Sequence, residues 1–188
     1  MQGTTPTFHA CTPEDAPDAA RPSLANIRKQ YGFIPEFYAY LAESPAALQA
    51  YQDLSARLRQ TTFTPPEQQA LLLAISVTNG CEFCVAAHSM AARRAKAPDA
   101  VVDALRALRP VEDTHYAALT AFAQAVVRER GWVRGAPLQA FFDHGFTPRQ
   151  AIEVVLAVAM KTLSNYVNHL TGAKTNPELA AESWQRPH

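Results

Sequence analysis

Helix start and stop signals recur along almost the whole chain, and no other feature of the sequence constrains its fold as strongly. Apolar segments of helical period follow residues that favour helix starts, namely Ser23, Ser44, Thr64, Pro98, Asp113 and Thr147. Two of these segments, 24–31 and 114–130, precede Gly32 and Gly131, where helices commonly stop. Strand signals are almost absent. The sequence therefore predicts an all-α fold of about eight to ten helices.

The chain has 188 residues, which suit one compact domain with a sizeable apolar core. Residues 1–20 are rich in Pro, Thr, Asp and Ala and lack a periodic apolar pattern, so we expect an extended or poorly ordered N-terminal arm. We expect residues 21–188 to form a single helical domain. The 17 basic residues balance 17 acidic ones, and the lack of any Lys or Arg run argues against a nucleic-acid partner.

Two features bear on the cellular compartment. The N-terminal segment has neither the basic start nor the apolar stretch of a signal peptide. The longest apolar region, 151–163, is short for a bilayer span and contains Glu153 and Lys161, so we interpret it as a buried core helix. We therefore expect a cytoplasmic protein without membrane contact. In a reducing compartment, a close pair of cysteines is more often catalytic or metal-binding than structural.

Two segments that begin with Phe-Thr-Pro, 63–88 and 146–169, indicate an internally duplicated helical unit. Both run from a cap through an apolar helix to a histidine, and the second is two residues shorter. Counting back from the histidines places Thr162 and Asn165 where the first segment has Cys81 and Cys84. Two unrelated helices of similar composition would also match in this way, so chance similarity is the alternative.

The stretch NGCEFCVAAH at 79–88 gathers residues that can carry redox chemistry. If a helix begins near Asn79, Cys81, Cys84 and His88 follow one another at single turns and share one face. A histidine can take the Cys84 proton to leave a nucleophilic thiolate, and Cys81 can close a disulfide on an oxidised Cys84. The helix dipole alone favours the lower pKa at Cys81, whereas contact with His88 favours Cys84.

The same stretch allows two other interpretations. Cys81, Cys84 and His88 could be three zinc ligands, but the sequence has no second Cys-x-x-Cys or paired-histidine motif to complete a structural site. Alternatively, the cysteines are small buried apolar residues and His88 hydrogen-bonds a neighbouring helix. The joint spacing and the Asn79-Gly80 break favour the redox interpretation, which needs no metal or organic cofactor.

NGCEFCVAAH resembles the Cys-x-x-Cys-x-x-x-His signature of the alkylhydroperoxidase D-like, carboxymuconolactone decarboxylase superfamily. The stretches at 31–48, YGFIPEFYAYLAESPAAL, and at 161–169, KTLSNYVNH, are similar to its branch of peroxidase-related enzymes. The resemblance implies an alkylhydroperoxidase D-like all-α fold, assembly into trimers or hexamers, and reduction of hydroperoxides with electrons from an external thiol. It implies that Cys84 attacks the peroxide, Cys81 resolves the sulfenic acid and His88 belongs to a proton relay.

One position departs from the family pattern. Many members carry a glutamate twelve residues before the first cysteine, and this chain has Gln69 there. Glutamine can orient a histidine or a water but cannot accept a proton at neutral pH, so we expect a weakened relay and slow turnover. The nearest carboxylates are Glu67, which the capping-box pattern with Thr64 explains, and Glu82, which suits an exposed first helical turn.

Several other polar and aromatic residues are weaker candidates. His169 stands with Asn165, Tyr166 and Asn168 near the end of an apolar helix, where a hydrogen-bonded helix end or a subunit contact is the more typical role. Of these, His169 is the best candidate for the site. Aromatic residues between 31 and 38 are more typical of core packing than of a substrate platform.

The sequence thus predicts a thiol-dependent peroxidase, with two alternatives. A carboxymuconolactone decarboxylase-type lyase is the competing enzyme class, but its proton-transfer chemistry does not require adjacent thiols. A redox-responsive oligomeric binding protein is the non-enzymatic alternative, in which the disulfide changes assembly or partner affinity.

Overall fold

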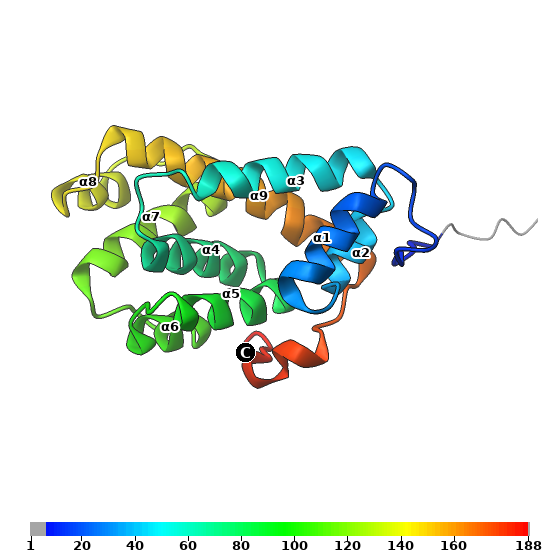
Figure 1. Cartoon of the computed structure of the whole chain (residues 1–188). Coiled ribbons are helices and arrows are strands. Elements are labelled where there is room, and N and C mark those ends of the chain that lie inside the picture. Colours follow the sequence, from blue (N-terminus) through cyan, green and yellow to red (C-terminus); the bar gives the residue numbers. More distant parts are fainter. Residues whose placement is uncertain (1–6, 188) are drawn as a thin grey trace, which may run out of the picture.

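The structure, a computed structural model, describes residues 7–187 and is all-helical over that range (Figure 1). The helices are α1 (Arg21–Tyr31), α2 (Glu36–Leu41), α3 (Pro45–Leu58), α4 (Pro65–Asn79), α5 (Glu82–Arg94), α6 (Asp99–Arg106), α7 (Thr114–Arg128), α8 (Ala136–Asp143), α9 (Pro148–Thr171) and a 3-10 helix, η1 (Pro177–Glu182). The predicted all-α fold class is confirmed. None of the helices in this range is both long enough and apolar enough to cross a membrane.

Most helix starts lie where the sequence predicts them. Thr64 and Glu67 form a reciprocal capping box at α4, and Thr147 does the same with Gln150 at α9. The predicted cap at Ser23 is wrong, because α1 already begins at Arg21, with a proline in its first turn. Ser23 lies within the helix and donates a hydrogen bond to Gln52 instead.

Helix α4 lies at the centre of the bundle and packs against α5, α6, α7 and α9 (Figure 1). Its residues 70–77 are all buried, which explains why its apolar residues surround the helix rather than forming one stripe. Helix α9 packs against α3 and α4 and reaches α5. The buried α4 thus holds α5 and α9 in place on its two sides.

The two predicted repeat segments begin alike but continue differently. The first is split into α4 and α5 at Gly80, whose left-handed backbone (φ 70°) ends α4. The second is the single helix α9 of 24 residues. The internal duplication stays a prediction.

The N-terminal arm was expected to be extended or poorly ordered, and residues 1–6 of it lie outside the described residues. Residues 7–20 form a series of turns, and Cys11, Ala16 and Ala20 are buried. The Cys11 amide donates to the carbonyl of Ala39 in α2 at 3.0 Å. Cys11 therefore belongs to the core, at a place separate from the Cys81–Cys84 pair.

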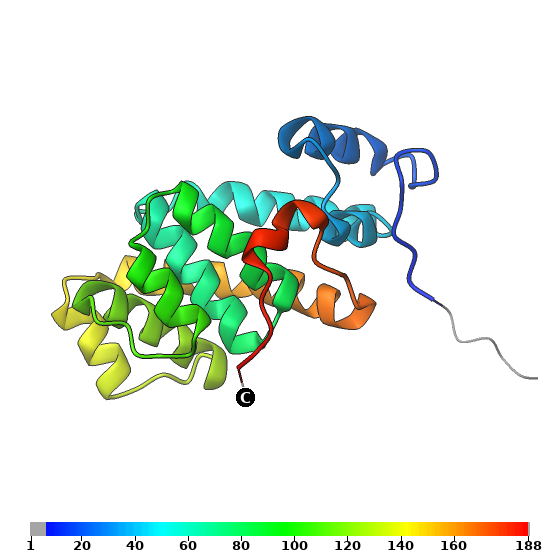
Figure 2. The same ribbon diagram turned by 90° about the horizontal axis from the view of Figure 1, so that it is seen from below.

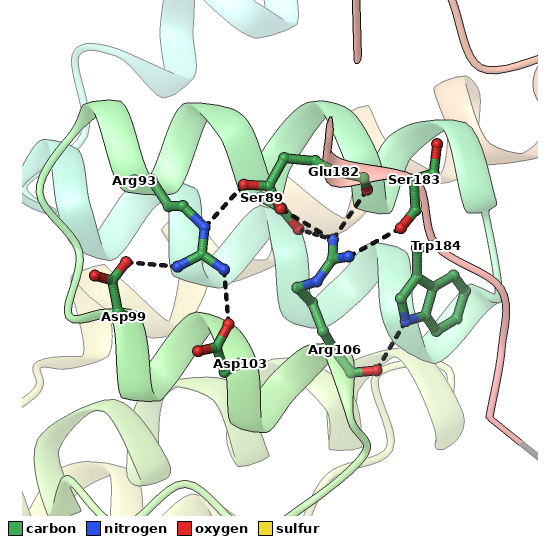
Figure 3. A network of polar contacts seen from close by, with 8 residues as sticks. All are labelled: Ser89, Arg93, Asp99, Asp103, Arg106, Glu182, Ser183 and Trp184. Atoms are coloured by element: carbon green, nitrogen blue, oxygen red, sulfur yellow. Dashed lines mark hydrogen bonds and ion pairs between the residues drawn. The ribbon is translucent and has the colours of Figure 1, made fainter. Parts of the chain in front are cut away.

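The C-terminal segment lies across α5 and is fastened by two arginines (Figure 2). Glu182 accepts hydrogen bonds from Arg93 at 2.8 Å and pairs with Arg106 at 3.4 Å, as Figure 3 shows. Arg106 also donates to the carbonyls of Glu182 and Ser183, and the Trp184 indole donates back to the Arg106 carbonyl at 2.7 Å. This network fixes η1 next to the site described below.

Candidate active site

The cysteine pair lies at the junction of α4 and α5. Helix α5 begins at Glu82, so Cys81 is its N-cap residue, with extended backbone, and Cys84 is in its first turn. The predicted helix start near Asn79 is therefore displaced, because Asn79 still ends α4 and Gly80 makes the turn. Both thiols are free and almost completely buried. A helix N-terminus stabilises negative charge, which favours thiolate formation here.

Asn168 of α9 connects the two sulfur atoms. Its Nδ2 donates to Cys84 Sγ at 3.2 Å and to Cys81 Sγ at 3.5 Å. Because one amide nitrogen contacts both sulfurs, the two thiols lie close together and share a hydrogen-bond donor. Asn165, one turn earlier on α9, accepts from Asn79 at 2.8 Å, and its buried Nδ2 has no hydrogen-bond partner among the described residues.

Lys161 of α9 is the main charge at the site. Its side chain is buried, with 1 % exposed, its Nζ donates to His88 Nε2 at 3.0 Å, and its charge acts on the Cys84 thiol. Among the ion pairs of residues 7–187, none joins Lys161 to a carboxylate. A buried ammonium needs a counter-charge, and a Cys84 thiolate supplies it.

The two thiols differ sharply in acidity. Burial raises the pKa of Cys84, but the neighbouring Cys81 thiol, the positive charge of Lys161 and the nearby Asn165 amide together lower it to about 5. The pKa of Cys81 is raised far above its ordinary range because its thiol proton is held by Cys84, and burial adds to this. Cys84 is thus the thiolate at neutral pH and Cys81 is the thiol.

His88 stands between Lys161 and Gln69. Its Nδ1 lies 3.1 Å from Gln69 Oε1, and its Nε2 accepts from Lys161. These partners assign the proton to Nδ1, because the amide oxygen of Gln69 can only accept. Burial and the charge of Lys161 lower the pKa of His88 well below 6.5, so the imidazole is neutral. The expected contact of His88 with Cys84 is replaced by a chain through Lys161.

A cavity of about 500 Å³ reaches this cluster. Cys84, His88 and Lys161 line it, whereas Cys81 does not. Aromatic side chains form much of the remaining wall, including Phe37 and Tyr51, which meet edge to face at 4.8 Å. A molecule in the cavity therefore meets the Cys84 sulfur first, and Cys81 lies behind it.

Comparison with known proteins agrees with this geometry. The sequence model of the carboxymuconolactone decarboxylase family matches residues 43–126. The structure resembles the alkylhydroperoxidase D core protein of Ralstonia eutropha JMP134, an uncharacterized peroxidase-related protein, with a TM-score of 0.81 and 24% identity over 94% of this chain and 96% of that one. It also resembles a peroxidase-related protein of Silicibacter sp. TM1040, with a TM-score of 0.76 and 19% identity over 95% and 96%.

The chain thus has the alkylhydroperoxidase D-like fold, and its residues 43–126 match the carboxymuconolactone decarboxylase family. The same fold occurs in the debrominase Bmp8, solved as a cysteine-to-alanine variant with 2,3,4-tribromopyrrole. That structure has a TM-score of 0.71 and 16% identity over 95% of this chain and 96% of that one. No protein with a curated function matches the sequence significantly.

The remaining predicted site residues lie away from the cysteine pair. Glu67 completes the α4 capping box and contacts His115 Nε2 at 2.6 Å. Glu82 is exposed in the first turn of α5. His169 is exposed and stacks on Tyr166. A step of one residue turns a helix by about 100°, so Asn168 faces the thiols and His169 does not.

The zinc interpretation has no geometric support from these residues. In the part of the chain that the structure describes, the one group of three close metal-ligand donors is His9, Cys11 and Asp15. Those donors lie in the N-terminal arm, where His9 and Asp15 already pair at 2.9 Å. The nitrogens of His88 face Gln69 and Lys161 instead of joining the two thiols.

Lys161 is the site residue that sequence reasoning missed. It was interpreted only as a polar interruption of an apolar segment. Its position within an apolar segment could have indicated a functional role, because a lysine on the buried face of a core helix needs a partner of opposite charge or a hydrogen-bond acceptor. Asn165 and Asn168 were candidates too, but the sequence interpretation gave them a structural role and named His169 as the best candidate of that group.

Proposed function

We propose that this protein is a thiol peroxidase that reduces organic hydroperoxides. The observation that carries the proposal is the arrangement of the pair. The acidic thiol, Cys84, faces a cavity, and the thiol of high pKa, Cys81, lies behind it. A peroxidase of this type needs an accessible thiolate that attacks the peroxide and a second, protonated thiol that then reacts with the sulfenic acid.

In the first step, the Cys84 thiolate attacks the outer oxygen of a hydroperoxide. An S–O bond forms and the O–O bond breaks, so Cys84 becomes a sulfenic acid and the peroxide leaves as an alkoxide. The alkoxide needs a proton, and the ammonium of Lys161 lines the same cavity as the attacking sulfur. Lys161 donates that proton, and the pair of His88 and Gln69 holds the lysine in place.

In the second step, the Cys81 sulfur attacks the Cys84 sulfenic acid. A disulfide forms, and the hydroxyl group leaves as water with the Cys81 proton. An external dithiol then reduces the disulfide by thiol exchange and is itself oxidised. The sum is one hydroperoxide and one dithiol converted to one alcohol, one water and one disulfide.

The test is hydroperoxide consumption by reduced protein with dithiothreitol. We expect Cys84→Ser to abolish turnover and Cys81→Ser to accumulate a sulfenic acid that a dimedone probe labels at Cys84. Cys11→Ser is the matched control, since Cys11 is a buried free thiol outside the site, and it keeps the wild-type rate. Peroxide loss in Cys84→Ser at the wild-type rate would contradict the proposal.

A second candidate is reductive removal of halogen from an aromatic ring. The aromatic wall of the cavity and the fold shared with a debrominase favour it. In that reaction, a ring carbon–bromine bond is replaced by carbon–hydrogen, bromide leaves, and the two thiols are oxidised to a disulfide. Bromide release from a bromopyrrole, measured beside peroxide loss, separates the two activities.

We also propose that the chain forms a homo-oligomer, with a trimer or hexamer expected. Helix α9 carries large exposed apolar side chains at helical spacing, namely Ile152, Val155, Tyr166 and Leu170, with 51–73 % exposed. Such a stripe along one helix is typical of an interface. A face that contacts the same face of a second copy makes a two-fold contact, which can join two trimers into a hexamer, whereas the contacts within a trimer need a second surface as well.

A further inference from the structure

The cavity has two chemically different ends, which α5 connects. Cys84 lies in the first turn of α5 and Arg94 is its last residue, and both line the cavity. Ten residues at 1.5 Å per residue separate them by about 15 Å along the helix axis. Ala87 and Ala91, one and two turns beyond Cys84, also line the cavity, so it follows this face of α5.

Helix α3 gives the opposite wall the same polarity. Tyr51 lines the cavity together with Cys84, and burial, with a smaller contribution from charge on Cys84 and Cys81, raises its pKa. Arg59, the residue that caps the end of α3, lines the cavity eight residues later, or about 12 Å along the axis between Cα positions, and its guanidinium turns back by one turn to Ser55. Helices α3 and α5 run in the same direction (Figure 1). Arg59 and Arg94 therefore share the end of the cavity remote from the thiols.

The charges along the cavity do not cancel. Lys161 is balanced by the Cys84 thiolate, which leaves Arg59, Arg94 and one carboxylate, Glu178, among the charged lining residues. In residues 7–187, neither arginine forms an ion pair with a carboxylate, and Arg59 donates only to Ser55. The remote end thus carries net positive charge and guanidinium donors that can bind a carboxylate.

The wall between the two ends is apolar. It includes Leu58, Leu72, Phe83, Met90 and Met160. The volume of about 500 Å³ holds about 17 groups of water size at about 30 Å³ each. An alkyl chain fits such a wall and volume, whereas a small polar peroxide leaves most of the apolar surface uncovered.

We propose that Arg59 and Arg94 form a carboxylate subsite, and that the substrate is a long-chain carboxylic acid that carries its hydroperoxide far from the acid group. The inference rests on the proposed peroxidase function. The axial span of about 15 Å from Cys84 to Arg94 corresponds to about 12 bonds of an extended chain, at about 1.2 Å per bond, and the Arg59 guanidinium, turned back to Ser55, reaches the chain nearer to the thiols. The peroxide oxygen then reaches Cys84 while the carboxylate reaches the arginines.

The experiment compares the free acid and the methyl ester of 13-hydroperoxyoctadecadienoic acid, both below their aggregation concentration, with cumene hydroperoxide as a small uncharged reference. The kcat/KM of each is measured for the wild type and for the double variant Arg59→Met/Arg94→Met. Arg57→Met is the matched control, because Arg57 is exposed in the last turn of α3 and does not line the cavity.

We expect the wild type to prefer the acid over the ester by about tenfold, a common effect of charge-assisted hydrogen bonds at a partly exposed site. The double variant brings that ratio to about one and keeps the wild-type rate with cumene hydroperoxide, whereas Arg57→Met retains the preference. A wild-type ratio of one, or an equal loss for all three substrates in the double variant, would overturn the subsite. If the wild type reduces none of the three, the peroxidase proposal itself fails.

Discussion

Replacing Lys161 with methionine should change how the reactivity of Cys84 depends on pH. Lys161, together with the neighbouring Cys81 thiol, lowers the pKa of Cys84 to about 5 from an ordinary 9.0. Without Lys161 that pKa should rise toward 9.0. A rise over the full interval, which sets the limit for the rates below, would lower the fraction of thiolate at pH 6 from ~90 % to ~0.1 %, and at pH 7 from ~99 % to ~1 %.

A second effect opposes the first. A thiolate of higher pKa is the better nucleophile, with a Brønsted coefficient of about 0.45, so four pKa units make each remaining thiolate ~60-fold faster. The variant should therefore be alkylated ~14-fold more slowly than the wild type at pH 6, at nearly the same rate at pH 7, and ~6-fold faster at pH 8. The two pH profiles cross near neutrality.

The assay is the rate of iodoacetamide alkylation at Cys84 between pH 4 and 10, followed by peptide mass spectrometry. The sign follows from the lowered pKa, since the wild-type thiolate is present above about pH 5 and is lost as the pH falls through that value. Lys29→Met, at an exposed position, is the control and keeps the wild-type profile. If the ratio of the two alkylation rates is the same at every pH, the assignment of Lys161 as the residue that lowers the pKa of Cys84 is refuted.

The thermal midpoint distinguishes this effect from unfolding. Lys161→Met removes a buried charge and leaves a neutral thiol rather than an unpaired ion, so the midpoint should not fall.

Three further changes test other parts of the structure. Gln69→Glu places a carboxylate beside His88 Nδ1, which raises the pKa of that imidazole and completes the relay. Steady-state peroxide turnover should therefore increase. An equal or slower rate would show that Gln69 does not limit turnover. Glu182→Gln weakens the contacts to Arg93 and Arg106 and should cost about 1–2 kcal/mol, or about 2–8 °C in Tm by calorimetry, with faster amide exchange in residues 177–184. Leu170→Glu inserts a charge into the exposed stripe of α9 and should lower the mass in light scattering, whereas an unchanged oligomer would exclude this face as the interface.

The helices could be predicted because their signals are local. Capping boxes at Thr64 and Thr147 and the glycine after Asn79 act within a few residues of the helix ends that they determine. The error at Ser23 has the same origin. Serine is a good cap, but the proline before it also favours a first turn, and the structure begins the helix there.

The candidate site could be predicted only in part, because its groups come from distant parts of the chain. Cys81, Cys84 and His88 are neighbours in sequence, and their spacing indicates shared chemistry. Lys161 and Asn168 reach the same atoms through the packing of α9 against α4 and α5, which no local pattern records. The order of thiol acidity was assigned by family resemblance, and the structure gives the same order for a different reason, the charge of Lys161.

The residues that set the reactivity of Cys84 lie on α9, outside the cysteine motif, and this affects how related proteins can diverge. The segment matched by the family, residues 43–126, contains both cysteines, His88 and Gln69, but ends before α9 begins. Lys161 and Asn168 are seven residues apart on one helix face, so a single inserted residue between them would turn one away by about 100°. Two chains with an identical cysteine motif can thus differ greatly in reactivity, and annotation transferred from the motif alone would not reveal it.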